Sequence, residues 1–178
     1  MDGNIIIARL DRNQYAGKKF SARYLTRGYY DTARTAEGFS IVYKPLEVAV
    51  EKELEDSFFS PWLEDPSAFG AFLNGELLGF AEGSPETWNQ RYRISNICIF
   101  QDQYRRRGIG QRLMDAILEE AERTGARMAV LETQSCNENA IAFYRKNEFD
   151  IIGLDLYAYS NYDPEWHEVR LEMGKELV

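Results

Sequence analysis

The segment Gln103–Gly110, with the sequence QYRRRGIG, constrains the fold of this chain more than any other stretch. It follows Arg93–Phe100, a run rich in β-branched residues that is typical of a strand. After it, apolar residues recur at helical spacing up to Gly125, where a helix is predicted to stop. The apolar positions are Ile109, Leu113, Met114, Ile117, Leu118 and Ala121. The sequence therefore predicts a strand that passes through an arginine- and glycine-rich turn into an amphipathic helix.

The predicted turn has the chemistry of a phosphate-binding site. A helix N-terminus directs several backbone N–H groups and the positive end of its dipole to one place, and glycine lets a ligand approach the backbone. Two common nucleotide motifs do not fit, because no Lys followed by Ser or Thr stands here and Leu113 replaces the third glycine of a dinucleotide fingerprint. The alternative is that Arg105, Arg106 and Arg107 form only a solvated basic patch.

A β-hairpin is predicted ahead of this turn. Two β-like runs, Ala68–Leu73 and Glu76–Glu82, are joined by Asn74-Gly75, the dipeptide most favoured in tight hairpin turns. We expect Arg93–Phe100 to form a third strand of the same sheet.

The region before residue 67 carries softer signals. Asn4–Leu10 is a candidate strand, and Val48–Trp62 mixes acids with apolar residues at the spacing of a helix. The chain has 178 residues, no internal repeat and no linker rich in Pro, Ser or Gly. We therefore expect one domain over residues 1–178, with residues 1–66 as its less certain N-terminal part.

Charge and composition narrow the class of partner. The formal net charge of −8 disfavours nucleic acid, whose binding depends on Lys and Arg, and is compatible with a cationic small molecule. We expect no metal site, because a single histidine, His167, and two separated cysteines cannot supply the usual zinc ligands. No apolar run approaches the ~18 residues of a membrane span, and the first residues do not read as a signal peptide. A cytoplasmic protein with no membrane partner is the resulting prediction.

A second set of motifs follows the predicted helix, and with the first it resembles a known family. The order and spacing of the segments are similar to those of the GNAT N-acetyltransferase superfamily, whose acetyl-CoA pyrophosphate loop has the pattern Gln/Arg-x-x-Gly-x-Gly/Ala. The segments are Arg105-x-x-Gly108-x-Gly110, the strand-like Met128–Thr133, the helix-opening Asn137-x-x-Ala140-x-x-Phe143-Tyr144 and the strand start Phe149–Gly153. The resemblance spans about residues 70–160. It implies an α/β (α+β) fold, a single GNAT-like domain with a mixed, partly splayed β-sheet flanked by α-helices.

A narrower resemblance concerns the acceptor. Leu131–Gln134, the loop Trp88–Tyr92 and the ending Glu168–Met173 are similar to streptothricin acetyltransferase-like members, which acetylate an amine of a polycationic antibiotic. This implies an acetyl-CoA-dependent N-acetyltransferase for a small cationic amine. The alternatives are a protein N-terminal or polyamine acetyltransferase, and a noncatalytic acyl-CoA-binding sensor. Family members are often dimers, so a homodimer is a further expectation.

The resemblance also assigns residues to the cosubstrate acetyl-CoA. Strand residues would offer backbone groups to its pantetheine arm, the turn would hold its pyrophosphate, and the second predicted helix would lie beside it. The strand residues are Ile97, Cys98 and Ile99; those of the turn are Arg105, Arg106, Arg107, Gly108, Ile109 and Gly110; those of the helix are Asn137, Ala140 and Tyr144. Asn137 has an alternative role as a helix cap, and Ser135-x-x-Glu138 also has the form of a capping box.

The catalytic assignment is complete for the acid but not for the base. Tyr144 matches the family's general acid, and a phenol, protonated at neutral pH, can donate to the departing thiolate. Many members carry a Glu on the strand before the loop, whereas Ser95-Asn96-Ile97 has no carboxylate. Glu82 and Glu132 are the predicted bases and Glu86 is a further candidate; a water relay or no dedicated base is the alternative. This chain also has Glu148 where many members have a glycine before the aromatic at position 149.

Overall fold

The computed structural model describes residues 4–178, which divide into two compact units. The first unit holds the described residues up to Arg23, Glu53–Val130 and Glu176–Val178. The second unit holds Tyr24–Lys52 and Leu131–Lys175.

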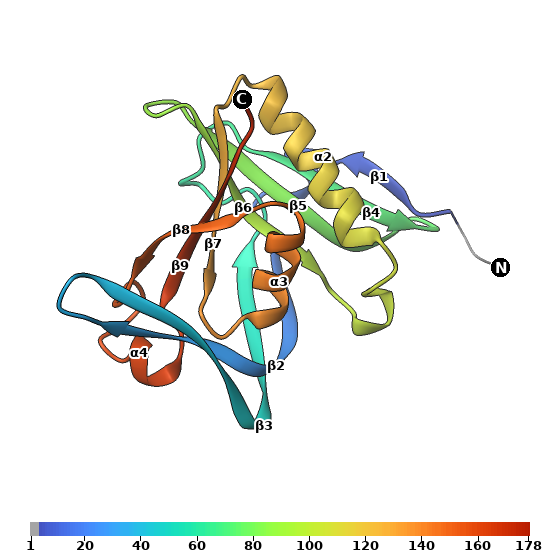
Figure 1. Ribbon diagram of the computed structural model, residues 1–178. Helices are drawn as coiled ribbons and strands as arrows, with labels where there is room; N and C mark the ends of the chain where they lie inside the picture. The colour runs from blue at the N-terminus through green and yellow to red at the C-terminus, as the bar shows by residue number, and fades with distance from the viewer. Residues whose placement is uncertain (1–3) are drawn as a thin grey trace. The chain divides into compact units, whose positions relative to one another are not determined.

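The first unit is built on antiparallel strands in the order β1-β4-β5-β6. Their bounds are β1 Ile6–Arg9, β4 Ser67–Leu73, β5 Glu76–Glu86 and β6 Arg91–Ile99. The helix α2, Ile109–Arg123, lies across β4, β5 and β6 (Figure 1). Every apolar position of the predicted amphipathic stripe is buried, which confirms the helix and its core-facing side.

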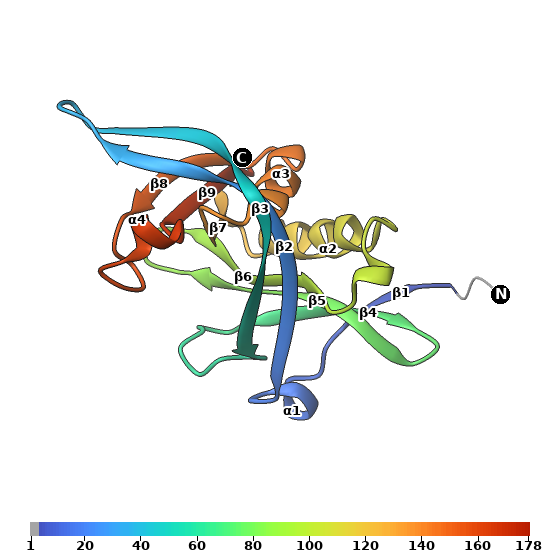
Figure 2. The same cartoon turned by 90° about the horizontal axis from the view of Figure 1, so that it is seen from below.

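The opposite face of these strands carries an aromatic core. Figure 2 shows α1, Arg12–Tyr15, on the side of β4 and β5 that α2 does not cover. The core is formed by Leu10, Phe20, Phe58, Phe59, Ala68 and Phe80, with Cys98 and Phe100 packed against it. The ring of Phe80 lies 4.3 Å from that of Phe58 and 4.8 Å from that of Phe20. Aromatic pairs at such distances stabilise beyond their buried area, so this cluster fixes the ends of β2 and β3 on β5.

The predicted hairpin is confirmed by β4 and β5. Asn74 and Gly75 both have positive φ, 51° and 86°, as a tight two-residue turn requires. Between β5 and β6 the register shifts, because Glu82 pairs with Asn96 while Gly83 pairs with Ile94. Ser95 is therefore an extra residue in β6, which is the pattern of a β-bulge.

The strands β2, Lys19–Arg34, and β3, Phe39–Ser57, form a separate two-stranded sheet. The prediction of helix-like structure over Val48–Trp62 is wrong, because β3 runs through most of that segment. Pairing with β2 supplies hydrogen bonds that a helix would have made internally, and tertiary pairing overrides a weak local pattern.

The second unit contains β8, Asp150–Asp155, antiparallel to β9, Arg170–Glu176, in the strand order β7-β9-β8. The strand β7, Met128–Gln134, begins in the first unit and continues into this one. The unit also holds α3, Glu138–Lys146, and α4, Asp163–Trp166. Within residues 4–178, no helix combines the length and apolar character needed to cross a bilayer.

Candidate active site

The turn before α2 joins β6 to the helix, in the order that the sequence predicts. Gly108 is the N-cap of α2 with a φ of 77°, in the left-handed region, and no side chain caps the helix there. Arg106 also has positive φ, 58°. The first helical residues are Ile109 and Gly110. N–H groups in the first turn of a helix have no hydrogen-bond partner within the helix. These N–H groups and the helix dipole can hold an anion such as a phosphate.

The three arginines of the turn differ in their surroundings. Arg105 forms an ion pair with Asp102 at 2.7 Å, and its Nη2 donates to the backbone oxygens of Arg23 and Ile99. Its guanidinium therefore ties the turn to β6 and to the N-terminal part of β2. Arg106 and Arg107 are exposed, and Arg107 lies 5.9 Å from the centre of the Tyr104 ring. Their charges face solvent, where an anionic ligand could reach them.

The three β6 residues predicted to hold the pantetheine arm do not all direct their backbone groups to the same edge of the strand. Phe100 donates its N–H to the Leu78 oxygen over 3.0 Å. Since hydrogen-bonded and non-bonded pairs alternate in an antiparallel ladder, Cys98 bonds to Phe80, and Ile97 and Ile99 direct their backbone groups to the opposite edge of β6. Burial raises the pKa of the Cys98 thiol to about 12, so this side chain is neutral at physiological pH. Ile97 and Ile99 are thus the two residues whose amides point away from β5.

The carboxylates of the first unit lie in contrasting environments. Glu82 is fully buried, and burial raises its pKa against the opposing hydrogen bonds from Phe59, Ser95 and Asn96. Glu86 is half-buried and ion-paired with Arg91 at 2.9 Å and Arg93 at 2.5 Å.

Burial alone would raise the pKa of Glu86. Its hydrogen bonds to Arg93, Asn89 and Arg91 outweigh that effect and lower the pKa. A base needs a pKa near the working pH, so Glu82 fits that role better than Glu86.

Glu132 lies in the second unit, on β7. Its side chain is 40% exposed and contacts Arg170 at 3.4 Å, and it lies beside the Tyr159 phenol. Burial first, and then the negative charge of Glu132, raise the pKa of Tyr159. The carboxylate is accessible but already paired with a cation.

Asn137, Ala140 and Tyr144 share α3 of the second unit. The Asn137 side chain accepts the Ala140 N–H at 3.3 Å and caps the helix. The Ser135-x-x-Glu138 capping box does not form, because Asn137 is the N-cap and the Glu138 N–H is donated to the Cys136 oxygen at 2.9 Å. The Ser135 hydroxyl donates to the His167 oxygen at 2.8 Å. Tyr144 is 8% exposed and packs near Phe149, with ring centres 6.3 Å apart.

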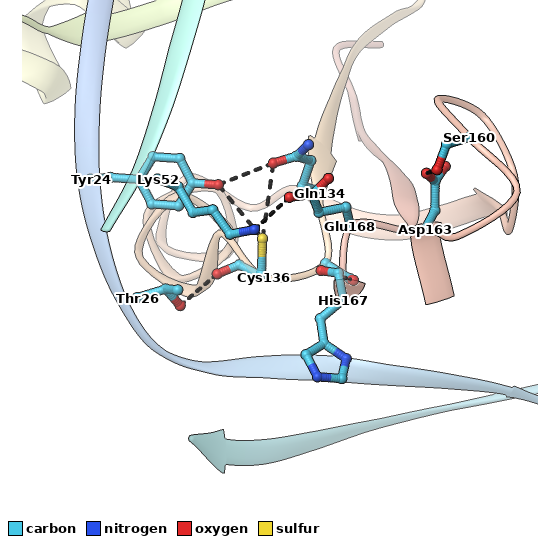
Figure 3. A network of polar contacts seen from close by, with 10 residues as sticks. Tyr24, Thr26, Lys52, Gln134, Cys136, Ser160, Asp163, His167 and Glu168 are labelled. Atoms are coloured by element: carbon cyan, nitrogen blue, oxygen red, sulfur yellow. Dashed lines mark hydrogen bonds and ion pairs between the residues drawn. The ribbon is translucent and has the colours of Figure 1, made fainter. Parts of the chain in front are cut away.

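A polar cluster next to α3 was not anticipated from the sequence (Figure 3). Tyr24 of β2 donates its hydroxyl to Gln134 at 3.1 Å and lies 3.6 Å from the Cys136 sulfur. Lys52 of β3 donates to Glu168 at 2.5 Å. Burial, then the neighbouring Cys136, raise the pKa of Tyr24, so its hydroxyl stays protonated. These contacts join residues more than a hundred positions apart, for which the sequence has no local signal.

The β2–β3 hairpin is also attached to the start of α3. Glu138 accepts the Arg27 N–H at 2.6 Å and the Tyr43 hydroxyl at 2.7 Å. Gly28 lies against Tyr43, and a Cβ at this position would clash with the Tyr43 hydroxyl oxygen. Glycine at position 28 therefore permits the close approach that this attachment needs.

The fold is that of an α/β acyltransferase, and comparison with known proteins identifies the type as one that uses acetyl-CoA. Within that class, the chain belongs to the acetyltransferase (GNAT) family, whose model matches residues 35–149. It is 31% identical over 144 residues to a streptothricin acetyltransferase from Streptomyces lavendulae, a match that covers 76% of each chain. The family resemblance, the α/β class with a mixed sheet flanked by helices, and the acetyl-CoA-dependent N-acetyltransferase activity are confirmed.

Two solved structures differ in how much of this chain they match. A nourseothricin acetyltransferase has a TM-score of 0.78 and 26% identity, covering 98% of this chain and 99% of its own. An Ard1 protein from Thermoplasma volcanium, also 26% identical, has a TM-score of 0.55 and covers 62% of this chain and 70% of its own. The likeness to the first structure therefore extends over parts of the chain that the likeness to the second does not.

Proposed function

We propose that this acetyltransferase acts on a primary amine of a small cationic acceptor of the streptothricin type. The observation that carries this proposal is the extent of the likeness to nourseothricin acetyltransferase, 98% of this chain. The Ard1 protein matches only 62% of the chain at the same identity. The net charge of −8 supports a polycationic acceptor, because it favours the approach of positive charge.

In this proposal the turn and β6 bind acetyl-CoA. The N–H groups of Gly108, Ile109 and Gly110 donate hydrogen bonds to the pyrophosphate oxygens, and the exposed Arg106 and Arg107 supply positive charge. Ile97 and Ile99 offer backbone groups to the pantetheine arm. Arg105 holds the turn in place through Asp102 and the two backbone oxygens.

The reaction needs a neutral amine, a polarised thioester and a proton for the departing sulfur. Glu82 is the proposed base, because it alone among the three candidate carboxylates is fully buried, has no ion pair in the described structure and has a raised pKa. The amine nitrogen then bonds to the thioester carbon, and the carbon–sulfur bond breaks. Tyr144 gives its proton to the thiolate and recovers one from the acylated nitrogen.

Steady-state CoA release tests this function. The purified protein is assayed with acetyl-CoA and streptothricin, polyamines, aminoglycosides and N-terminal peptides. We expect saturable release with streptothricin at a kcat/KM well above that of the others. CoA release with only a peptide or only a polyamine would contradict a streptothricin-type acceptor and identify that amine class as the acceptor. Silence with every amine, together with tight CoA binding by calorimetry, would favour the sensor alternative.

A further inference from the structure

The strand β6 carries no carboxylate at Ser95, Asn96 or Ile97, yet two of these side chains contact carboxylates that come from other strands. Glu82 belongs to β5 and Asp56 to the end of β3, and both lie in the first unit. Together, Asp56, Glu82, Ser95 and Asn96 form the carboxylate cluster.

The bulge in β6 brings two neighbouring side chains to Glu82. Successive residues of a strand normally point to opposite faces. Here Asn96 pairs with Glu82 and the extra residue Ser95 breaks the alternation. The Ser95 hydroxyl lies 3.2 Å from Glu82 Oε1, and the Asn96 amide also interacts with the Glu82 carboxylate.

The two oxygens of Glu82 have different partners. Oε2 accepts the Phe59 N–H at 2.6 Å, a contact within the buried core. Oε1 faces the Ser95 hydroxyl, and Ser95 is only partly buried whereas Glu82 has no exposed surface. A proton from outside therefore reaches Glu82 most directly through Ser95.

Asn96 joins Glu82 to Asp56. Its Nδ2 donates to Asp56 Oδ2 at 3.0 Å. Asp56 Oδ1 accepts the Ser57 N–H at 2.7 Å, which fixes the orientation of this carboxylate. An amide that contacts two carboxylates holds both in one geometry and places a second negative charge near Glu82.

We propose that Asp56 is a positioning residue that acts through Asn96 on Glu82, and that the Ser95 hydroxyl passes the acceptor's proton to Glu82. The inference rests on the proposed function, since it concerns proton removal from the acceptor amine. The cluster thereby supplies the carboxylate that β6 itself lacks.

The proton step conserves atoms and charge. An N–H bond of the acceptor ammonium breaks and its proton goes to Ser95 Oγ, while the Ser95 hydroxyl proton passes to Glu82 Oε1. The products are a neutral amine, an unchanged serine and a protonated Glu82. After acetyl transfer, Glu82 returns its proton to solvent by the same route.

The charges around Glu82 set the direction of the expected effects. Asp56 from β3 and the Tyr92 phenol from β6 are titratable groups that interact with Glu82. Burial raises the pKa of Glu82 most, the Asp56 charge adds to that rise, and the bonds from Phe59, Ser95 and Asn96 oppose it. Removing the Asp56 charge should therefore lower the pKa of Glu82, and removing the Ser95 hydroxyl should raise it.

The test combines a carboxyl titration with a pH profile. Protein labelled with ¹³C at the Glu side-chain carboxyl is titrated by NMR, with E82Q to assign the signal. We expect D56N to move the Glu82 midpoint down by about 0.5 pH unit or more, and S95A to move it up. The acidic limb of kcat/KM should move with it in D56N. S95A should lose about 10-fold or more in kcat, and S95T should recover most of it. E55Q is the matched control, because Glu55 neighbours Asp56 but is exposed.

Each outcome decides one statement. An unmoved Glu82 midpoint in D56N overturns the positioning role, whatever the acceptor. A midpoint that moves without the kinetic limb overturns the role in proton removal, and equal turnover in S95A overturns the relay. The titration needs no acceptor, so it tests the positioning role of Asp56 independently of the proposed function. Failure of every amine in the panel would overturn the proposed function, and with it the role of Glu82 and Ser95 in proton removal. If D56N fails to fold, N96D and S95A carry the same titration, with N96D expected to raise the midpoint.

Discussion

Phe59 donates its backbone N–H to Glu82 Oε2 over 2.6 Å while holding a φ of 52°. A bulky residue rarely adopts the left-handed region, so the contact and the burial of the Phe59 ring together hold the loop after β3 in a costly conformation. Glu82 is thus part of the core as well as a candidate base, and its protonation is coupled to folding.

The free energy of unfolding should therefore decrease as the pH rises from the ordinary pKa of Glu82 to its raised pKa in the folded state. Burial holds the pKa of Glu82 above its ordinary value of 4.5 in the folded state, so between these two values the folded state binds more protons than the unfolded state. The stabilisation that protonated Glu82 gives to the folded state is fully present below pH 4.5. It is lost as the pH rises through the folded pKa, by up to about 1.4 kcal/mol per pH unit. E82Q should remove this slope.

Urea unfolding of the wild type and E82Q at intervals from pH 4 to pH 8 measures the effect. Parallel curves for the two proteins would contradict the linkage. Glu64→Gln, an exposed carboxylate, is the control and should leave the slope unchanged.

Glu120 has the opposite linkage. It is 6% exposed, and its carboxylate contacts Arg123 Nη2, Arg9 Nη2 and the Ser67 hydroxyl, each at 2.8 Å. The hydrogen bond from Arg123, with those from Arg9 and Ser67, lowers the pKa of Glu120 to about 2 against the opposing effect of burial. Its stabilisation is present above the ordinary value of 4.5 and is lost as the pH falls towards about 2.

E120Q should lower the free energy of unfolding at pH 7 by about 1 to 3 kcal/mol, with the lower part of that range favoured because both arginines are half exposed or more. The difference from the wild type should shrink below pH 4. E119Q on the exposed side of α2 is the control. A difference that persists undiminished at pH 2.5 would show that Glu120 acts through packing rather than charge.

What the sequence could predict depended on whether the signal was local. Asn74-Gly75 predicted its hairpin and the stripe from Ile109 to Ala121 predicted α2, because a turn's φ angles and a helix face are set by neighbouring residues. The segment after Val48 was misassigned, since its strand depends on β2, about twenty positions earlier.

In the candidate site, too, local features could be predicted from the sequence and long-range contacts could not. The turn at Gly108 and the cap at Asn137 could be predicted, because each is a property of one short segment. The contact of Asn96 with Asp56 and that of Tyr24 with Gln134 could not, because they arise from long-range packing and from a bulge.

Asn137 caps α3 and is also a predicted CoA contact, and two substitutions distinguish these roles. N137A should lower the free energy of unfolding by about 1 kcal/mol, because the Ala140 N–H loses its acceptor. N137D keeps an acceptor at a helix N-terminus and should restore stability. Calorimetry with CoA on N137D then tests the cofactor prediction: a loss of about 10-fold or more in affinity retains Asn137 as a CoA contact, and unchanged affinity leaves only the cap.

Tyr144 is expected to act in the chemical step alone. Y144F keeps the packed ring beside Phe149 and removes the hydroxyl, so turnover should fall at least ~10-fold while CoA affinity stays nearly unchanged. Steady-state kinetics with calorimetric CoA binding measure both. Y157F is a matched control, because Tyr157 is 49% exposed. Equal turnover in Y144F would remove Tyr144 as the acid.

Glu148 occupies a position that suits glycine. It has a φ of 67° just after α3, where Glu148 donates its N–H to the Arg145 oxygen at 3.0 Å and Phe149 donates to the Tyr144 oxygen at 3.0 Å. These two bonds form the Schellman pattern that ends a helix through a left-handed residue. A residue with a Cβ is strained there by roughly 1 to 2 kcal/mol, whereas glycine is not.

E148G should therefore raise the free energy of unfolding by about 0.5 to 1 kcal/mol, even though it removes the ion pair with Lys175 at 2.8 Å. That pair is exposed on the Glu148 side, so its loss should cost little. E148A removes the pair but keeps the strain, and should be no more stable than the wild type. Denaturant unfolding at pH 7 distinguishes the three proteins, and an E148G less stable than E148A would show that backbone strain does not govern this turn.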